Sequence, residues 1–340
     1  MPMKIRINDH QLIQWIQGVV TKFQVFYPLQ DANSGVVHIQ KATDSLNADA
    51  ILKPVSGVPK TSIKTFFMPQ PEVIARFSIA AQDAEAFVLK EPGTALQTQV
   101  LLNIRPCDAR SVALNSMPYA EDPYFQKMMK RTVIIGRPCD ETCSTCFCEL
   151  VGGSPHGTEG MDLVILKTED GLALEVLTQK GADFLKQNPC AESAGLQPTL
   201  QQQGGQELPI VAREMQKKDL LALYNASFWP QIAEACINCG ACTFLCPTCY
   251  CFDIQDEVAG TKGVRLRYWD SCMFPLFTLH ASGHNPRGQK MQRVRNRFMH
   301  KFKYFPDRFG PVSCVGCGRC VKDCPVNIDI REVISLMQAV

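Results

Sequence analysis

The 340-residue chain lacks the sequence signatures of several common enzyme classes. No G-x-G-x-x-G sequence follows a predicted strand, so we do not expect the chain to bind a dinucleotide or a flavin by itself. H-E-x-x-H, phosphate-loop and serine-elbow motifs are also missing, which leaves hydrolase functions without support. No stretch approaches the roughly twenty apolar residues of a membrane span, and the N-terminus lacks the apolar segment of a signal peptide. We therefore expect a cytoplasmic protein without a membrane span.

An excess of charge of either sign is missing as well. The 35 Lys and Arg residues nearly balance the 33 Asp and Glu residues, so we expect no nucleic-acid partner. The range 271–306 is an exception, because it contains no acidic residue. Its basic residues are Arg287, Lys290, Arg293, Arg295, Arg297, Lys301 and Lys303. Two interpretations stay open: a solvated helix face over a negatively charged cofactor, or a docking surface for an acidic partner.

Cysteine, in contrast, is abundant. The chain has 17 cysteines and no export signal, which indicates metal or redox chemistry rather than a disulfide framework. Eight of them form two copies of the run Cys-x2-Cys-x2-Cys-x3-Cys-Pro, at 236–247 and 314–325. This spacing is typical of [4Fe-4S] clusters, because one tight loop supplies three thiolates. Zinc is the weaker alternative, since zinc sites usually separate their ligands into two distant pairs.

The two runs are expected to exchange ligands. In bacterial ferredoxins the fourth cysteine of each run binds the cluster of the other run. We therefore predict a first site that consists of Cys236, Cys239, Cys242 and Cys324. The predicted second site consists of Cys314, Cys317, Cys320 and Cys246.

The length of the chain suits two domains in an α+β arrangement. We expect residues 1–187 to form a mixed α/β domain. The range 188–225, rich in Gln and Gly in its first half, is expected to be a linker with a lead-in helix. Residues 226–340 are expected to form a ferredoxin-like, largely α-helical domain with two clusters.

Hydrophobic patterns predict several elements of the N-terminal domain. A helix is expected to begin at Asn8 or Asp9. The apolar runs 100–104 and 132–135 are expected to be buried parallel strands joined by a crossover helix. The runs 163–166 and 172–177 flank an Asp-Gly turn signal and predict a hairpin.

Five further cysteines follow the two predicted parallel strands, namely Cys107, Cys139, Cys143, Cys146 and Cys148. Each strand is followed by the same Arg-Pro-Cys-Asp sequence, so Cys107 and Cys139 are expected at one edge of the sheet, where α/β proteins bind ligands. A third cluster fits this edge. The spacing of Cys139, Cys143 and Cys146 also matches radical S-adenosylmethionine enzymes, although Thr145 stands where that motif normally has an aromatic residue. Structural thiols are the remaining alternative.

Several motifs together resemble one protein family. They are Arg105-Pro-Cys-Asp108, Thr145-Cys-Phe-Cys148, Cys246-Pro-Thr-Cys-Tyr-Cys-Phe-Asp253, Trp269-Asp-Ser-Cys272, His300-Lys-Phe-Lys-Tyr304 and Cys314-Val-Gly-Cys-Gly-Arg-Cys320. The family contains the iron–sulfur subunit of anaerobic sulfite reductase and the beta subunit of cytoplasmic sulfhydrogenase. The resemblance extends from about Lys64 to the C-terminus.

The resemblance implies an electron-transfer subunit of a larger oxidoreductase, with no catalytic residues of its own. It implies a flavin subunit that oxidises NAD(P)H as one partner, and a catalytic subunit of the sulfite reductase, hydrogenase or heterodisulfide reductase type as the other. It also implies a third [4Fe-4S] site that consists of Cys107, Cys139, Cys146 and Cys148. Outside this class, the alternatives are a radical S-adenosylmethionine enzyme and an iron–sulfur regulator that binds nucleic acid.

Five cysteines exceed the needs of three clusters. Cys143 falls where the related proteins often have another residue. Cys249, Cys251 and Cys272 are expected to be small buried thiols, and Cys190 is expected to be a surface thiol. Among the six histidines, we expect His300 to have a structural role.

Overall fold

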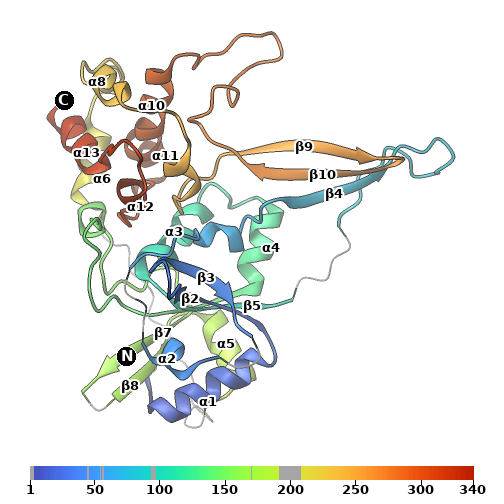
Figure 1. The fold of residues 1–340 in the computed structure, drawn as a ribbon, viewed down its shortest axis with the longest axis vertical. Coiled ribbons are helices and arrows are strands. Elements are labelled where there is room, and N and C mark those ends of the chain that lie inside the picture. The colour runs from blue at the N-terminus through green and yellow to red at the C-terminus, as the bar shows by residue number, and fades with distance from the viewer. Residues whose placement is uncertain are drawn as a thin grey trace.

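The computed structural model describes residues 4–43, 46–53, 55, 57–92, 97–169, 171–190 and 208–340. A seven-stranded mixed sheet organises the N-terminal half (Figure 1). Its strand order is β1 (Lys4–Ile7), β8 (Gly171–Val176), β7 (Leu163–Thr168), β6 (Thr132–Gly136), β5 (Gln99–Ile104), β2 (Gln24–Gln30) and β3 (Val37–Lys41). The four central strands are parallel, and every residue of β5 and β6 is buried. Such central strands need helices on both faces of the sheet.

Two hydrophobic cores cover the two faces of this sheet. The first face packs against α1 (Asp9–Val20), α2 (Ala48–Leu52) and α5 (Gln179–Gln187). The opposite face packs against α3 (Pro106–Ser116), α4 (Pro123–Arg131) and the short 3-10 helix η1 (Ile63–Phe66). The alternation along β5 follows this division, because Val100 and Leu102 belong to the first core while Leu101 belongs to the second.

The structure confirms the local predictions for this half. Asn8 caps α1, and the side chain of Asn8 and the side chain of Gln11 each accept a backbone N–H of the other at 2.9 Å. The strands β5 and β6 are parallel neighbours, and β7 and β8 form the predicted antiparallel hairpin. The crossover between β5 and β6 contains two helices rather than one, because Asp122 caps a second helix that begins at Pro123.

Helices dominate the C-terminal half. They are α6 (Ile210–Lys217), α7 (Leu220–Tyr224), α8 (Trp229–Glu234), α9 (Ala241–Phe244), α10 (Lys290–Met299), the π-helix η3 (His300–Tyr304), α11 (Phe305–Phe309), α12 (Arg319–Lys322) and α13 (Ile330–Ala339). Residues of α6, α10 and α13 share one core with Val151, which ends the 3-10 helix η2 (Glu149–Val151) of the N-terminal half. Residues 191–207 of the predicted linker lie outside the described residues.

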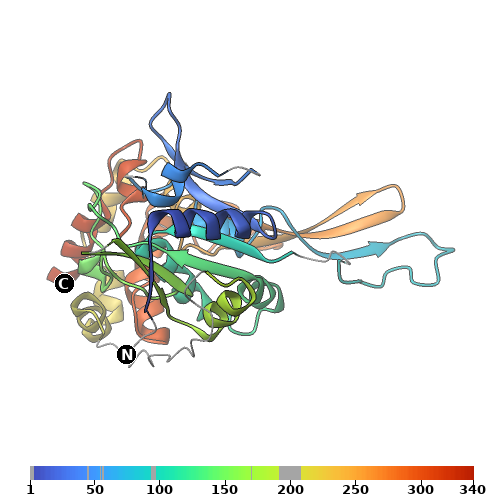
Figure 2. The ribbon, with the colours of Figure 1, turned by 90° about the horizontal axis from the view of Figure 1, so that it is seen from below.

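A three-stranded arm projects from the body of the molecule (Figures 1 and 2). Its order is β4 (Glu72–Ser78), β10 (Lys262–Trp269) and β9 (Phe252–Ala259), with both pairs antiparallel. The arm joins a strand from the predicted N-terminal domain to a hairpin from the predicted C-terminal domain. The sequence analysis did not predict this hairpin, in which all eight residues of β9 are exposed.

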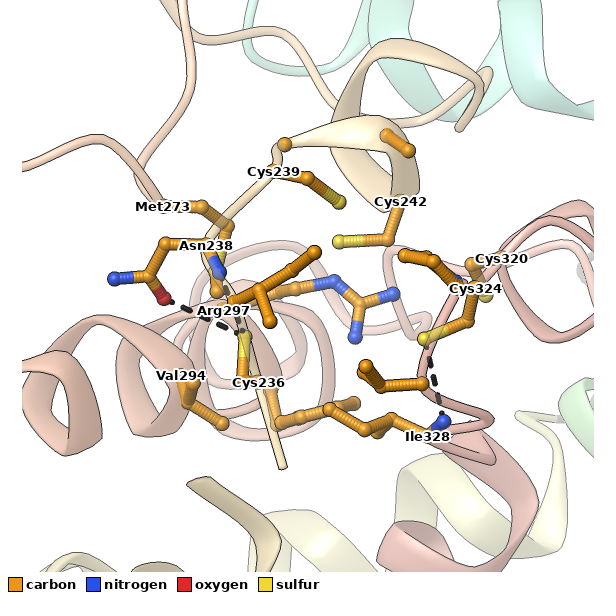
Figure 3. A pocket seen from close by; sticks show the side chains of 16 residues that line it. Cys236, Asn238, Cys239, Cys242, Met273, Val294, Arg297, Cys320, Cys324 and Ile328 are labelled. Atoms are coloured by element: carbon orange, nitrogen blue, oxygen red, sulfur yellow. Dashed lines mark hydrogen bonds between the residues drawn. The ribbon is translucent and has the colours of Figure 1, made fainter. Parts of the chain in front are cut away.

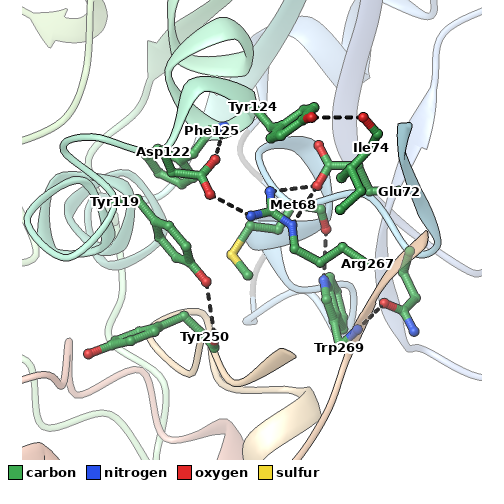
Figure 4. Close-up of polar contacts among 11 residues, drawn as sticks. Met68, Glu72, Ile74, Tyr119, Asp122, Tyr124, Phe125, Tyr250, Arg267 and Trp269 are labelled. Carbon is green, nitrogen blue, oxygen red and sulfur yellow. Dashed lines mark hydrogen bonds and ion pairs between the residues drawn. The ribbon is translucent and has the colours of Figure 1, made fainter. Parts of the chain in front are cut away.

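Buried ion pairs fix the root of the arm (Figure 4). The guanidinium of Arg267 is 4% exposed and binds the carboxylates of Glu72 at 2.5 Å and Asp122 at 2.7 Å. The indole of Trp269 donates to the carbonyl of Met68 at 2.7 Å. These contacts attach β10 to the N-terminal half at the root of the arm. Throughout the described ranges, no helix is long and apolar enough to cross a membrane.

Candidate metal centre

The four cysteines of the predicted first site line a single cavity (Figure 3). Cys236 and Cys239 lie on the loop that leads into α9, Cys242 lies in α9, and Cys324 reaches the same cavity from the second run. Backbone N–H groups point at two of the sulfur atoms, from Asn238 to Cys236 at 3.4 Å and from Ile328 to Cys324 at 3.2 Å. Cys320, assigned to the second site, also lines this cavity, so the two sites are neighbours.

A buried arginine faces the first cavity. Arg297 of α10 is 5% exposed, and two of its guanidinium nitrogens, Nε and Nη2, have no hydrogen-bond partner among the described residues. Burial alone lowers the pKa of Arg297, but the neighbouring thiol groups of Cys242 and Cys320 raise that pKa overall. Buried donors of this kind normally have an acceptor. Four sulfur ligands and unpartnered N–H donors therefore fit an anionic cofactor that carries its own acceptor atoms.

The cysteines of the predicted second site are more deeply buried. Cys314 and Cys317 are buried, and burial raises the pKa of Cys314 to about 11. Cys246 comes from the first run, and its negative charge also raises the pKa values of Cys314, Cys317 and Cys320. The structure thus brings the crossing cysteine to the other three.

Lys301 supplies a buried positive charge to the second site. Its ammonium group donates to the sulfur of Cys246 at 3.3 Å, to the hydroxyl of Thr248 at 3.1 Å and to the carbonyl of Ser313 at 2.9 Å. Burial disfavours the charged lysine, yet the thiol groups of Cys246 and Cys249 hold its pKa well above the usual value. The ammonium group therefore stays charged beside the sulfur atoms.

The cysteines assigned to the third site meet at the carboxyl ends of β5 and β6. Cys107 lies in the first turn of α3, and Cys139 follows β6 directly. Cys146 and Cys148 are hydrogen-bonded to each other, and this bond lowers the pKa of Cys146 to about 6 and raises that of Cys148. Cys107 and Cys139 raise the pKa of Cys148 further. Cys143 lies nearby, but its sulfur accepts from the guanidinium of Arg105 at 3.1 Å.

The second and third sites are in direct contact. The backbone N–H of Phe147 donates to the carbonyl of Gly316 at 2.8 Å. The loop that holds Cys146 and Cys148 is therefore hydrogen-bonded to the loop that holds Cys314 and Cys317. A side-chain carbon added at Gly316 would lie 2.6 Å from the Cα atom of Cys148. Arg319, 3% exposed, forms an ion pair at 2.9 Å with Asp108, which follows Cys107 and is 1% exposed. No sequence pattern indicated this pair, because its partners lie 211 residues apart.

Most basic side chains of the range 271–306 are buried, which the sequence did not predict. Five of its seven basic side chains are buried, namely Arg293, Arg295, Arg297, Lys301 and Lys303. Arg297 and Lys301 face sulfur atoms, whereas Lys303 donates to the carbonyls of Met215 and Gln216 at 3.2 and 3.0 Å. Most of the charge asymmetry therefore lies in the interior rather than on a solvated face, and Arg297 and Lys301 are placed where they could offset the charge of a cofactor.

Among the additional cysteines, Cys251 pairs with Cys272, and Cys249 pairs with Cys246 of the second site. Cys272 is buried as expected, whereas Cys249 and Cys251 are half-buried. Lys64, 4% exposed, donates to the carbonyl of Cys249 at 3.1 Å, a contact that sequence analysis did not suggest.

Two other single residues were also predicted. The surface prediction for Cys190 is wrong, because its side chain is 4% exposed in the core beneath α1. The Nε2 atom of His300 is hydrogen-bonded to the hydroxyl of Tyr250 at 3.1 Å, and burial lowers the pKa of His300 to about 4. These contacts agree with a structural role for His300.

Within the described ranges, no three His, Cys, Asp or Glu side chains are grouped so that they could hold a metal ion. At the first site the cysteines are instead distributed around a cavity.

Two comparisons relate the chain to known proteins. A family model of the 4Fe-4S dicluster domain matches residues 235–328, the range that contains both cysteine runs. Sulfhydrogenase 2 subunit beta of Pyrococcus furiosus is 30% identical over 275 residues, which covers 76% of this chain and 80% of the relative. The similarity therefore extends beyond the dicluster domain into the N-terminal half.

Proposed function

The chain belongs to the iron–sulfur subunit family that includes the sulfhydrogenase beta subunit, and we propose that it transfers electrons through three [4Fe-4S] clusters. Its partners in this proposal are a flavoprotein subunit that oxidises NAD(P)H and a catalytic subunit. The catalytic subunit is of the sulfite reductase, hydrogenase or heterodisulfide reductase type. A [4Fe-4S] cluster takes up or releases one electron, so such a chain can connect a two-electron donor to a distant acceptor.

The observation that carries this proposal is that the three predicted sites, with four cysteines each, adjoin one another. Cys320 of the second site also lines the cavity of the first site. Gly316, in the second cysteine loop, is hydrogen-bonded to the loop that holds Cys146 and Cys148. This contiguity supports a linear order of first, second and third site.

The buried cations support the same proposal. Arg297 faces the first cavity, Lys301 binds Cys246 at the second site, and Arg319 lies between the second and third sites. Despite its burial, the pKa of Arg319 is raised by Asp108 and by the thiol groups of Cys317 and Cys107. Uncompensated buried cations are costly, so Arg297, whose Nε and Nη2 have no partner among the described residues, favours a negatively charged cofactor beside it.

Iron analysis tests the number of clusters. The anaerobically purified chain should contain about twelve irons, and Cys107→Ser should remove about four of them. Cys190→Ser is the control, because Cys190 is also a cysteine of the N-terminal half but is buried in the core beneath α1. Cys143→Ser should also retain the iron. Equal iron content in Cys107→Ser and the parent chain would eliminate the third site.

A second variant tests the crossed assignment. Cys324→Ala should change the electron paramagnetic resonance spectrum of the cluster at Cys236, Cys239 and Cys242, despite the distance in sequence. A spectrum that changes only at the cluster of Cys314, Cys317 and Cys320 would show that each run binds its own cluster.

The partners are tested by purification of the chain from its native host without oxygen. Mass spectrometry of the intact complex should identify a flavoprotein and a catalytic subunit, and the second of these defines the reaction. A chain that elutes alone with its iron would be an independent electron carrier rather than part of a complex.

A further inference from the structure

The projecting arm has one covered edge and one open edge. The segment 86–90 covers the outer edge of β4, because Arg76 and Lys90 exchange backbone hydrogen bonds of 2.8 Å and Phe87 donates to the carbonyl of Ser78 at 2.7 Å. On the other side of the arm, β9 pairs with β10, and no other described residue pairs with it. The N–H and C=O groups along the outer edge of β9 are thus available to another strand.

β9 lacks most of the features that protect an edge strand, although it carries three carboxylates. Its sequence contains no Lys, Arg or Pro, and its pairing with β10 is regular over eight residues. The only register shift of β10 lies in its pairing with β4. Phe252, Ile254 and Val258 are 37%, 47% and 50% exposed on one side of the strand. A long, regular edge with exposed apolar side chains is a site for strand addition.

The polar side chains of β9 are largely satisfied within the arm. Asp256 binds Arg265 through two hydrogen bonds of 2.7 Å, and Glu257 accepts from the hydroxyl of Tyr268 at 2.5 Å. Asp253 accepts from Gln255 at 2.9 Å. What remains for a partner is therefore the open backbone edge, the apolar side chains and a net negative charge.

This charge decides between two occupants. Asp256 is neutralised by Arg265, so pairing with β9 of a second copy would bring Asp253 and Glu257 of each chain into one ladder without a basic residue in either strand. Like charges in cross-strand contact are destabilising. A strand with basic residues pairs with β9 without this penalty, so the occupant that fits is a different protein.

We propose that β9 is a docking site to which another protein of the complex adds an extended strand, with apolar side chains at alternate positions and Lys or Arg residues opposite the β9 carboxylates. The inference rests on the proposed function within a complex. The ion pairs of Arg267 attach the root of the arm to the N-terminal half. β9 starts directly after Cys251, whose carbonyl accepts from Asp270 at 2.9 Å, so a docked partner is held beside the cysteine-rich region.

The double variant Ile254→Lys/Val258→Lys tests the docking site, because lysines on an edge strand block strand addition. The control is Ile210→Lys/Leu221→Lys, which charges two apolar residues of α6 and α7 that are 63% and 67% exposed. Both are introduced into the full chain in its native host, and the complex is purified without oxygen. We expect the β9 variant to lose about tenfold or more of one partner protein per chain, with unchanged iron content, and the control to keep it.

Hydrogen exchange on the intact complex provides the second readout. Backbone amides of 252–259 should exchange more slowly in the complex than in the isolated chain. Equal exchange, or a β9 variant with full partner content, would overturn the docking site while leaving the proposed function intact. A wild-type chain that dimerises through β9 would identify a second copy as the occupant and also overturn the proposal. Absence of both iron and partners from the wild-type chain would overturn the proposed function itself.

Discussion

The two cysteine loops have the same backbone but different surroundings. Asn238 and Gly316 occupy equivalent positions with φ of 55° and 63°, and Gly240 and Gly318 follow with φ of 74° in both loops. In each loop, the residue two positions after the first cysteine donates its backbone N–H to the sulfur of that cysteine. The distance is 3.4 Å both from Asn238 to Cys236 and from Gly316 to Cys314. The repeated spacing therefore produces a repeated local structure.

The surroundings of the loops determine which residues they tolerate. Ile237 of the first loop is 62% exposed, whereas the equivalent Val315 is 2% exposed. Asn can adopt the left-handed conformation in the exposed loop, because its short polar side chain tolerates that region. Gly316 has no such freedom, because the backbone of Cys148 occupies the space of a side chain. The comparison indicates that the first loop faces the surface and that the second connects the two halves of the molecule.

Among the substitutions considered, Gly316→Ala is expected to reduce stability the most. The added carbon atom would lie 2.5 Å from the carbonyl oxygen of Phe147, so the loop of Cys146 and Cys148 must move. We expect loss of the third-site iron and about 4 kcal/mol of stability, from overpacking and from backbone strain. Iron analysis measures the first loss, and urea unfolding without oxygen measures the second.

Asn238→Ala is the matched control for this substitution. It tests the same left-handed position in the exposed loop and should cost roughly 1 kcal/mol while retaining all iron. Equal losses in the two variants would show that the backbone conformation, rather than contact with the third site, determines the need for glycine.

The sequence predicted the parts of this molecule that depend on local spacing. The cysteine runs, the buried strands β5 and β6 and the cap at Asn8 are all determined by neighbours in sequence. The arm was missed, because the pairing of β4 with β10 joins residues almost 200 positions apart, such as Glu72 and Arg267. The burial of the basic residues was also missed, since the charge of a residue in a sequence does not indicate whether a cofactor or solvent faces it.

A smaller effect is expected from Asp108→Asn, which leaves the buried guanidinium of Arg319 without its anionic partner. Removal of one member of a buried ion pair costs about 3 kcal/mol. Because the pair joins the second loop to the third site, the variant should lose third-site iron before first-site iron during stepwise unfolding. Simultaneous loss of both would contradict the proposed connecting role of the second loop.

Arg297→Met changes the first site without breaking an ion pair. Loss of a positive charge beside the four cysteines should make addition of an electron to the proposed first cluster less favourable. The midpoint potential of that cluster should therefore fall. We expect a fall of roughly 60 mV, which corresponds to about 1.4 kcal/mol in a one-electron step. Arg297→Lys keeps the positive charge and should show a smaller fall. Potentiometric titration followed by electron paramagnetic resonance measures this shift.

Arg295→Met is the control for Arg297, because Arg295 is also buried but stacks on the ring of Tyr224 at 3.4 Å and donates to its carbonyl. Its removal should lower stability without changing the potential. A shift of the same size in both variants would mean that Arg297 acts through packing rather than through its charge.

The smallest effect on stability is expected from Ile237→Ser, and this variant tests the exposed loop most directly. Ile237 buries little surface, so its truncation should change the free energy of unfolding by less than about 0.5 kcal/mol, whereas Val315→Ser should cost about 2 kcal/mol at the equivalent buried position. An apolar side chain that is largely exposed and lies beside Cys239, which is itself exposed, fits contact with an electron-transfer partner. We therefore expect slower electron exchange with that partner in Ile237→Ser, measured by stopped-flow kinetics, at unchanged iron content. An unchanged rate would mean that the first loop is exposed without being an electron-transfer contact.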